Sequence, residues 1–231
     1  MKKLTVARRP LGLKLKTERA VVLLSGGLDS TVALYHALAK GYSCHALIFD
    51  YKQRHKKEKK YAVASAQMLG ISYDIIKIEM PWGGSALTDV KIGIPLNKKL
   101  DRNGVPSTYV PGRNSIFLCF AFSCAEAIGA GSIFLGAHIQ DYSGYPDCRP
   151  EYIIAMESAV NSGLACRKIK IKTPLLNMDK TGIIKLGIKY GVDFSRTWSC
   201  YCGTEKPCGK CDSCRYRIRA FAELGMNDPA L

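Results

Sequence analysis

Short apolar runs alternate along this chain with longer amphipathic stretches. The apolar runs predict strands over 20–24, 43–49, 72–77, 132–136 and 170–173. The amphipathic stretches predict helices over 30–40, 56–69, 114–128, 151–161 and 179–190, and a last helix that ends at 223. Strands that alternate with helices are typical of βαβ units. We therefore expect an α/β fold with a doubly wound, mainly parallel sheet flanked by helices.

One long stretch, residues 80–112, follows neither pattern. It holds four prolines and several glycines, and it is too long for an ordinary connection between a strand and a helix. We expect it to form a functional loop over the ends of the strands.

The most informative motif directly follows the first predicted strand. It is Ser25-Gly26-Gly27-Leu28-Asp29-Ser30, and a predicted helix follows it. Adjacent glycines allow a sharp turn that brings backbone N–H groups against an anion, and a helix directs its positive N-terminus to the same place. A tight turn without a ligand is the alternative. The strand, the flanking serines and the helix together favour a phosphate-binding loop, of neither the Walker nor the dinucleotide-binding type.

Polar segments also follow other predicted strands. They lie at residues 50–55, at the end of the long loop over 109–114, and at residues 138–149. In an open parallel sheet the carboxyl ends of the strands share one edge, and ligands bind there near the point where the strand order reverses. The sequence therefore predicts that these segments and the glycine loop form one site.

Composition limits the classes of protein that fit. The 231 residues are 47% hydrophobic and 9% aromatic, which is typical of a folded globular chain. No apolar run approaches the ~20 residues that span a bilayer. The basic N-terminus lacks the apolar core of a secretory signal, so we expect a cytoplasmic protein without a membrane partner.

The chain is strongly basic, with a formal net charge of +15 and one cluster at residues 54–60. Such a charge suits either a nucleic-acid surface or a solvated exterior that attracts an anionic nucleotide. The cluster has no interleaved aromatic residues that could stack on bases. We favour the solvated exterior and do not expect direct nucleic-acid binding.

Half of the ten cysteines lie between residues 200 and 214. Cys200, Cys208, Cys211 and Cys214 could close a tetrahedral Zn²⁺ site, whereas the spacing of the last three also suits a [4Fe–4S] cluster. The compact set of four favours zinc. Because thiolates fill every position, we expect this zinc to be structural, and we interpret Cys202 as a bystander.

These features suggest three parts of the chain. A basic extension covers residues 1–19, an α/β domain covers 20–196, and a small helical zinc-binding segment over 197–231 packs on that domain. The zinc would tie the C-terminal helix to the rest of the protein.

Several motifs, in chain order, resemble one enzyme family. The glycine loop resembles the pyrophosphate loop of ATP pyrophosphatases, which holds the β- and γ-phosphates while a substrate oxygen attacks the α-phosphate. The later motifs are Phe49-Asp50-Tyr51 with Gln53-Arg54-His55, Tyr109-Val110-Pro111-Gly112-Arg113-Asn114, Ser143-Gly144-Tyr145-Pro146-Asp147-Cys148-Arg149 and Thr197-Trp198-Ser199-Cys200-Tyr201. Over roughly residues 20–225 the set resembles the QueC family of 7-cyano-7-deazaguanine synthases, which have a HUP-like fold and act in queuosine or archaeosine biosynthesis.

The resemblance implies an ATP-dependent carbon–nitrogen ligase. Its substrates would be 7-carboxy-7-deazaguanine, ammonia and ATP, and its product would be 7-cyano-7-deazaguanine (preQ0), formed through an adenylated carboxylate and an adenylated amide. The resemblance also implies zinc on the four cysteines, Mg²⁺ with the ATP, and a homodimer. The implied ATP-binding segment consists of Leu24, Ser25, Gly26, Gly27, Leu28, Asp29, Ser30, Thr31, Val32, Ala33 and Leu34.

Roles for single side chains are hypotheses. The catalytic candidates are Asp29, Arg113 and Lys180. Arg113 could pair with the substrate carboxylate or a phosphate, and Lys180 could neutralise charge on ATP. Asp141 or Asp147 could accept hydrogen bonds from the guanine-like edge, and Tyr145 could stack on the deazapurine. The full candidate set for substrate binding is Arg113, Asn114, Asp141, Ser143, Tyr145, Asp147 and Arg149.

The chain departs from the family pattern at three places. Lys52 stands where a glycine is usual, Gly182 where a glutamate is common, and Cys202-Gly203-Thr204 replaces the usual Arg/Asn-Gly-Gly. The first departure could reshape the loop beside the nucleotide. The general base is left open, with His55 and His138 as the histidines considered.

Other interpretations remain. Another ATP pyrophosphatase, such as a tRNA thiolase or a lysidine-type synthetase, would share the glycine loop, and a relative could activate a protein carboxylate instead. A thiolase needs a reactive cysteine or an iron–sulfur cluster near the ATP. A nucleotide-binding module without turnover is a further alternative, against which Asp29 and the paired glycines argue.

Overall fold

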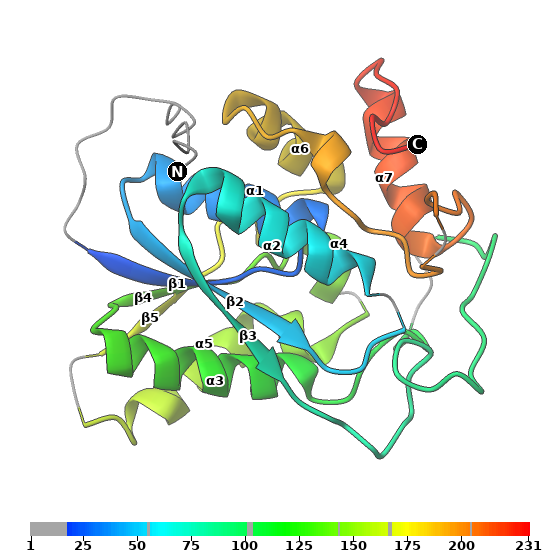
Figure 1. The fold of residues 1–231 in the computed structure, drawn as a ribbon. Coiled ribbons are helices and arrows are strands. Elements are labelled where there is room, and N and C mark those ends of the chain that lie inside the picture. Colours follow the sequence, from blue (N-terminus) through cyan, green and yellow to red (C-terminus); the bar gives the residue numbers. More distant parts are fainter. Residues whose placement is uncertain (1–17, 55, 101–103, 143, 166–167, 204) are drawn as a thin grey trace, which may run out of the picture.

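The computed structural model describes residues 18–231 except residues 55, 101–103, 143, 166–167 and 204 (Figure 1). The basic extension, apart from its last two residues, therefore lies outside the described residues. Five strands form one sheet in the order β3-β2-β1-β4-β5, and each neighbouring pair is parallel. The strands are β1 Arg19–Leu23, β2 Ser43–Asp50, β3 Ser72–Lys77, β4 Ser132–Phe134 and β5 Lys170–Lys172.

Helices cover both faces of the sheet (Figure 1). They are α1 Leu28–Ala39, α2 Lys57–Leu69, α3 Arg113–Ile128, α4 Ile139–Tyr142, α5 Pro150–Asn161, α6 Lys180–Lys189 and α7 Asp212–Glu223, with short 3₁₀ helices η1 Pro146–Cys148 and η2 Phe194–Arg196. The helices α1 and α2 lie on one face, and α3 and α5 lie on the other. The predicted fold class is confirmed.

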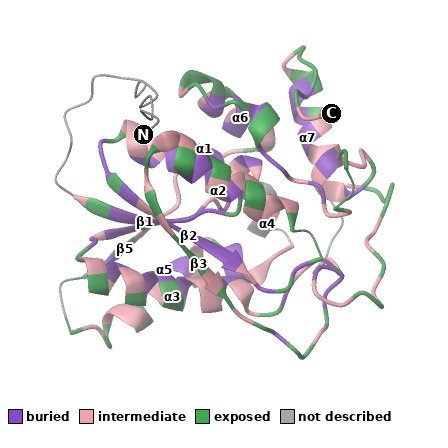
Figure 2. Cartoon of the chain, in the orientation of Figure 1, coloured by how far each residue is buried: buried purple, intermediate pink, exposed green. Residues whose placement is uncertain are grey.

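The core follows from the alternation of side chains along the central strand. Val21 faces α3 and packs with Leu118 and Phe122, whereas its neighbour Val22 faces α1 and packs with Leu34. Successive residues of a strand point to opposite faces, so a strand covered on both sides is apolar throughout. Figure 2 accordingly shows β1 and β2 as largely buried.

A further apolar cluster joins the C-terminal helices to α1. Val32 of α1 packs with Ile183 of α6 and Phe221 of α7, all of which are buried. This cluster holds the C-terminal segment beside the end of the sheet where α1 begins. No helix in the described part of the chain is both long enough and apolar enough to cross a membrane.

The predicted strands and helices are all present, with ends that differ by at most two residues. Sequence analysis missed α4, η1 and η2, because each is a single turn that leaves no periodic pattern. In the long loop the described residues form no helix or strand; an isolated bridge joins Leu96 to Cys211, and Asn97 N donates to Lys210 O at 2.9 Å. The long loop thus contacts the segment over 200–214 that carries the clustered cysteines, here called the cysteine segment.

Lys52 follows β2 in a left-handed backbone conformation, with φ at 57°. A residue with a Cβ atom pays about 1–2 kcal/mol for that conformation, which glycine avoids. The Lys52 ammonium lies 2.6 Å from the Glu79 carboxylate, but both side chains are more than half exposed, so the pair contributes at most about 1 kcal/mol.

We therefore expect Lys52→Gly to be more stable than Lys52→Ala by about 1 kcal/mol. Both variants lose the ion pair, but only alanine keeps the backbone strain. Thermal unfolding should place the glycine variant about 2–4 °C above the alanine variant. Equal melting temperatures would show that the left-handed conformation carries no cost here.

Candidate active site

A cavity opens at the carboxyl ends of β1, β2 and β4. The strand order reverses between β1 and β4, so the cavity occupies the place where open parallel sheets bind ligands. Its polar lining residues are Ser25, Asp29, Ser30, Tyr51, Gln53, Glu58, Thr108, Arg113, Asn114, Asp141, Tyr145, Ser199, Tyr201 and Ser213. These residues come from four segments that follow strands and from the cysteine segment. The predicted convergence is confirmed.

The glycine loop forms the floor of the cavity beside α1. Ser25 Oγ lies 2.9 Å from Ser30 Oγ, and Gly27 N donates to Ser25 Oγ at 3.2 Å. The helix α1 begins directly after Gly27, and no side chain caps its N-terminus. Backbone N–H groups of a first helical turn carry partial positive charge. The loop therefore offers amides, hydroxyls and a helix dipole to an anion.

Gly26 fixes the loop between two other parts of the protein. Its φ is 83°, and a Cβ atom there would lie 2.3 Å from Glu58 O and 2.5 Å from Ala62 N of α2. On the other side Trp198 N donates to Gly26 O at 2.9 Å. Only glycine permits this approach, so α2 and the segment that leads to Cys200 both position the glycine loop.

Asp29, in the first turn of α1, forms a charged cluster with side chains from α6 and from the segment after β4. Lys180 Nζ lies 2.7 Å from Asp29 Oδ1 and 2.8 Å from His138 Nε2. Burial opposes ionisation of Asp29, but the charges and hydrogen bonds of Lys180 and His138 outweigh it and hold the pKa of Asp29 well below its usual value. Asp29 is therefore an anion at neutral pH.

His138 is buried and contacts a second acid of the cavity. Its backbone N donates to Asp141 Oδ2 at 3.2 Å, and its Nε2 lies 3.4 Å from the same oxygen. The Nδ1 atom is buried without a hydrogen-bond partner among the described residues.

Arg113 and Glu58 bring a cation and a further acid to the cavity. Arg113 is the first residue of α3; its Nη1 donates to Tyr51 Oη at 3.3 Å, and its guanidinium lies 6.0 Å from the Phe117 ring. Glu58, in the first turn of α2, is partly buried. Burial raises the pKa of Glu58 to about 7; the charge of Arg113 opposes that rise, and the charge of Cys200 adds to it.

Most of the predicted site residues meet at this cavity. Those that line it are Leu24, Ser25, Gly27, Asp29, Ser30, Arg113, Asn114, Asp141 and Tyr145. Lys180 reaches it through its contact with Asp29. The aromatic ring of Tyr145 lies 6.1 Å from that of Tyr109, and its hydroxyl lies 2.9 Å from Thr108 Oγ1.

Other predicted site residues do not line the cavity. Asp147 is buried, and its Oδ2 accepts a hydrogen bond from Asn114 N at 3.0 Å, so it stabilises the start of α3. Arg149 is exposed and precedes α5. Val32, Ala33 and Leu34 are buried in the apolar clusters around α1. Ser143 lies outside the described residues.

Tyr51 and Gln53 belong to the segment 50–55 that sequence analysis placed at the site, although it gave neither side chain a role; it missed Thr108 and, above all, Glu58. Glu58 belongs to the basic run that we interpreted as a solvated exterior. Its position in the first turn of the helix that packs on Gly26 distinguishes it from the surrounding lysines. That contact is made across the fold and leaves no local pattern.

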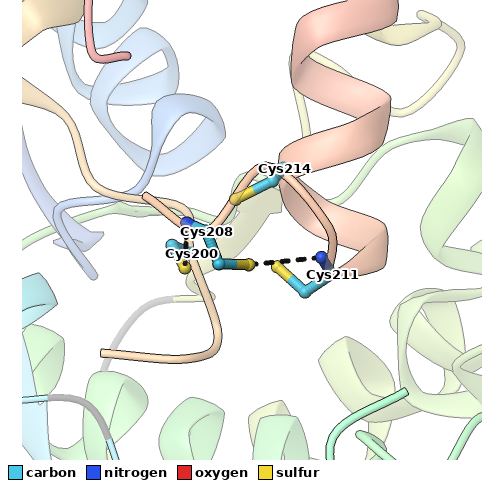
Figure 3. A group of neighbouring side chains, drawn as sticks. All are labelled: Cys200, Cys208, Cys211 and Cys214. Carbon is cyan, nitrogen blue, oxygen red and sulfur yellow. Dashed lines mark hydrogen bonds between the residues drawn. The ribbon is translucent and has the colours of Figure 1, made fainter. Parts of the chain in front are cut away.

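The four predicted cysteines also converge (Figure 3). The sulfur atoms of Cys200, Cys208, Cys211 and Cys214 all lie within 4.8 Å of one another. Backbone N–H groups donate to two of them: Cys208 N to Cys200 Sγ and Cys211 N to Cys208 Sγ, each at 3.3 Å.

This spacing fits a single tetrahedral ion. With Zn–S bonds near 2.3 Å the sulfur atoms of such a site are about 3.8 Å apart, whereas a [4Fe–4S] cluster needs room for its irons and sulfides between the thiolates. Cys202 is not part of the group, in agreement with its interpretation as a bystander. The cluster is joined to the cavity through Trp198 and the glycine loop.

The parallel sheet, the cavity at the carboxyl ends of its strands and the cysteine cluster define a doubly wound α/β protein with a candidate ligand site. The chain belongs to the family described as queuosine biosynthesis protein QueC, whose model matches residues 19–225. The resemblance seen in the motifs is thereby confirmed.

Curated relatives extend over nearly the whole chain. A 7-cyano-7-deazaguanine synthase of Thermosynechococcus vestitus is 49% identical over 221 residues, which cover 92% of this chain and 95% of the relative. The 7-cyano-7-deazaguanine synthase of Nostoc punctiforme is 50% identical over 219 residues, which cover 91% of this chain and 98% of the relative. Among solved structures, NMN synthetase from Francisella tularensis is similar with a TM-score of 0.50 and 20% identity, over 91% of this chain and 78% of that one; this likeness concerns the fold alone.

Proposed function

We propose that this protein converts 7-carboxy-7-deazaguanine, ammonia and ATP into 7-cyano-7-deazaguanine. The observation that carries the proposal is the family match together with an intact phosphate loop and Arg113 in one cavity. The curated relatives that are about half identical to the chain carry the name of this synthase.

The chemistry explains why a phosphate loop is needed. A carboxylate is a poor electrophile, so its oxygen attacks the α-phosphate of ATP, pyrophosphate leaves, and ammonia then displaces AMP to give an amide. The nitrile requires loss of the remaining oxygen as well, which a second adenylation of the amide makes possible. One pyrophosphate loop serves both steps in this proposal.

The residues of the cavity suit these roles. The backbone N–H groups and hydroxyls of the loop would hold the β- and γ-phosphates, and Lys180 would offset their charge beside Asp29. Arg113 would bind the substrate carboxylate, and aromatic side chains such as Tyr145 would contact the deazapurine. Asp29 and Asp141 are carboxylates that could supply oxygen ligands to Mg²⁺ bound with ATP.

Direct assay tests the function. The zinc-loaded protein is incubated with ATP, ammonium and 7-carboxy-7-deazaguanine, and the products are identified by mass spectrometry. We expect an amide first and then the nitrile, and neither product when one substrate is omitted. If the folded, zinc-loaded protein forms neither the amide nor the nitrile from the acid, the proposal is contradicted.

The cavity gives little support to thiolation chemistry. Cys148 lines it, but burial raises the pKa of this thiol above its ordinary value, and its sulfur accepts a hydrogen bond from Asn114 Nδ2 at 3.1 Å. A buried, protonated thiol is a poor nucleophile. The four clustered cysteines are taken by the metal in our proposal.

We further propose one structural Zn²⁺ per chain, held by the four cysteines. Metal analysis should give one zinc and no iron per chain. Cys208→Ser should lose the metal and lower the melting temperature by on the order of 10 °C, whereas Cys202→Ser should keep both. Equal zinc content in the two variants would contradict this ligand set.

The expected setting of the enzyme is the cytoplasm, where it would act on small molecules rather than on nucleic acid. We propose a homodimer, as the family resemblance implies. Light scattering should then report twice the 25.4 kDa mass of one chain.

A further inference from the structure

Glu58 is the one acid of the cavity that the proposed steps leave without a task. Its backbone oxygen lies against Gly26 of the glycine loop, and Glu58 is among the residues that line the cavity, as is Arg113. Among the described residues no side chain forms a hydrogen bond or ion pair with the Glu58 carboxylate. Desolvated acids are costly to leave unpaired, so the arrangement points to a ligand that Glu58 meets.

Arg113 and Glu58 face the cavity as separate charges. Each influences the other electrostatically, yet no ion pair joins them. The Tyr51 hydroxyl accepts a hydrogen bond from Arg113 but carries no negative charge that would neutralise it. Space between an unpaired cation and an unpaired carboxylate suits two reactants of opposite charge held side by side. On the proposed function, the anionic reactant is the carboxylate at Arg113, and the cationic one is ammonium.

We propose that Glu58 is the catalytic residue that binds ammonium and takes a proton from it. This inference rests on the proposed function and assigns the general base that sequence analysis left open.

The step balances as follows. In solution at neutral pH ammonia is almost wholly ammonium, which has no lone pair to attack. The Glu58 carboxylate accepts one proton, and the nitrogen lone pair forms a bond to the carbonyl carbon of the acyl-adenylate. The carbon–oxygen bond to AMP breaks and AMP departs with its electron pair, while the second proton of the former ammonium passes to water. Burial raises the pKa of Glu58 above its ordinary value, which makes the carboxylate a stronger base than an exposed one.

Glu58→Gln tests this role, because it removes the charge and keeps the shape. We expect the acid-dependent exchange of pyrophosphate into ATP to continue, since that step needs no amine. Amide formation from ammonium should fall by about 100-fold or more, the usual contribution of a general base. Hydroxylamine is largely uncharged at neutral pH, so the rate of hydroxamate formation should stay within a few-fold of wild type.

Matched variants separate this role from a structural one. Glu79→Gln removes an exposed acid outside the cavity and should leave all three rates unchanged. If Glu58→Gln does not fold, Glu58→Asp is the substitute, because its shorter side chain keeps the charge but moves the carboxylate away from the cavity. It should still reduce the rate of amide formation more than the rate of hydroxamate formation. In Glu58→Gln the amide rate should also recover as the pH rises and free ammonia accumulates.

Three results would overturn the proposal. If the rates of amide and hydroxamate formation fell equally, Glu58 would be needed for adenylation or for folding and not for deprotonation of ammonium. A higher KM for the deazaguanine acid with an unchanged KM for ammonium would show that Glu58 binds the guanine-like edge instead. Absence of acid-dependent exchange in the wild type would contradict the proposed function itself, and with it this role.

Discussion

Asp29→Asn is expected to lower acid-dependent AMP formation by about 100- to 1,000-fold while the protein stays folded. Asp29 lies at the start of α1 in the glycine loop, and its carboxylate accepts a hydrogen bond from Lys180 Nζ at 2.7 Å. An amide cannot offset that charge or ligate a cation with equal strength. Loss of one preorganised electrostatic contact typically costs this much in rate. Radiolabelled ATP with AMP separated by chromatography measures the change.

The control is Asp74→Asn, which alters an exposed acid on β3 that pairs with His45 at 3.0 Å. It should change the rate of AMP formation little, because Asp74 does not line the cavity. Circular dichroism checks that both variants are folded. If Asp29→Asn formed AMP at the wild-type rate, the contact between Asp29 and Lys180 would have no part in catalysis.

Asp228→Ala is expected to destabilise the protein by about 3–5 kcal/mol. The Asp228 and Arg217 side chains are 3% and 5% exposed, and two hydrogen bonds of 2.7 and 2.9 Å join them. Arg217 also donates to Thr197 Oγ1 at 2.6 Å and so links α7 to the segment that positions the glycine loop. Removal of one partner leaves a buried charge without its counterion, which is the costly case. Denaturant unfolding measures the loss.

Arg219→Gln serves as the comparison, because it alters an ion pair with Glu223 that is about half exposed and spans 3.8 Å. Exposed pairs contribute about 1 kcal/mol or less. If the two variants unfold at the same denaturant concentration, the buried pair does not anchor the C-terminal segment.

The fold was predictable because its pattern is local. Apolar runs and amphipathic stretches mark the strands and helices, and parallel strands place their carboxyl ends together whatever the side chains are. The glycine loop and the segment before Arg113 could therefore be assigned to one site. The elements that sequence analysis missed, such as α4 and η1, are too short to repeat.

The interior contacts of the site were not predictable, because they join distant residues. The Lys180–Asp29 pair spans 151 positions in the chain, and Glu58 lies in a lysine-rich run that suggests solvent. Asp147 was, with Asp141, a candidate for the guanine-like edge of the substrate, yet its side chain accepts a hydrogen bond from the backbone of Asn114. Residue type indicates what a group can do, and only the fold determines what it meets.

The central proposal is that one phosphate loop activates the same carbon twice. The most direct test uses 7-carboxy-7-deazaguanine with ¹⁸O in both carboxylate oxygens, followed by mass spectrometry of the AMP released. We predict two AMP molecules per nitrile, each carrying one ¹⁸O, because each oxygen leaves on an α-phosphate. Unlabelled AMP, or one AMP per nitrile, would contradict two adenylations.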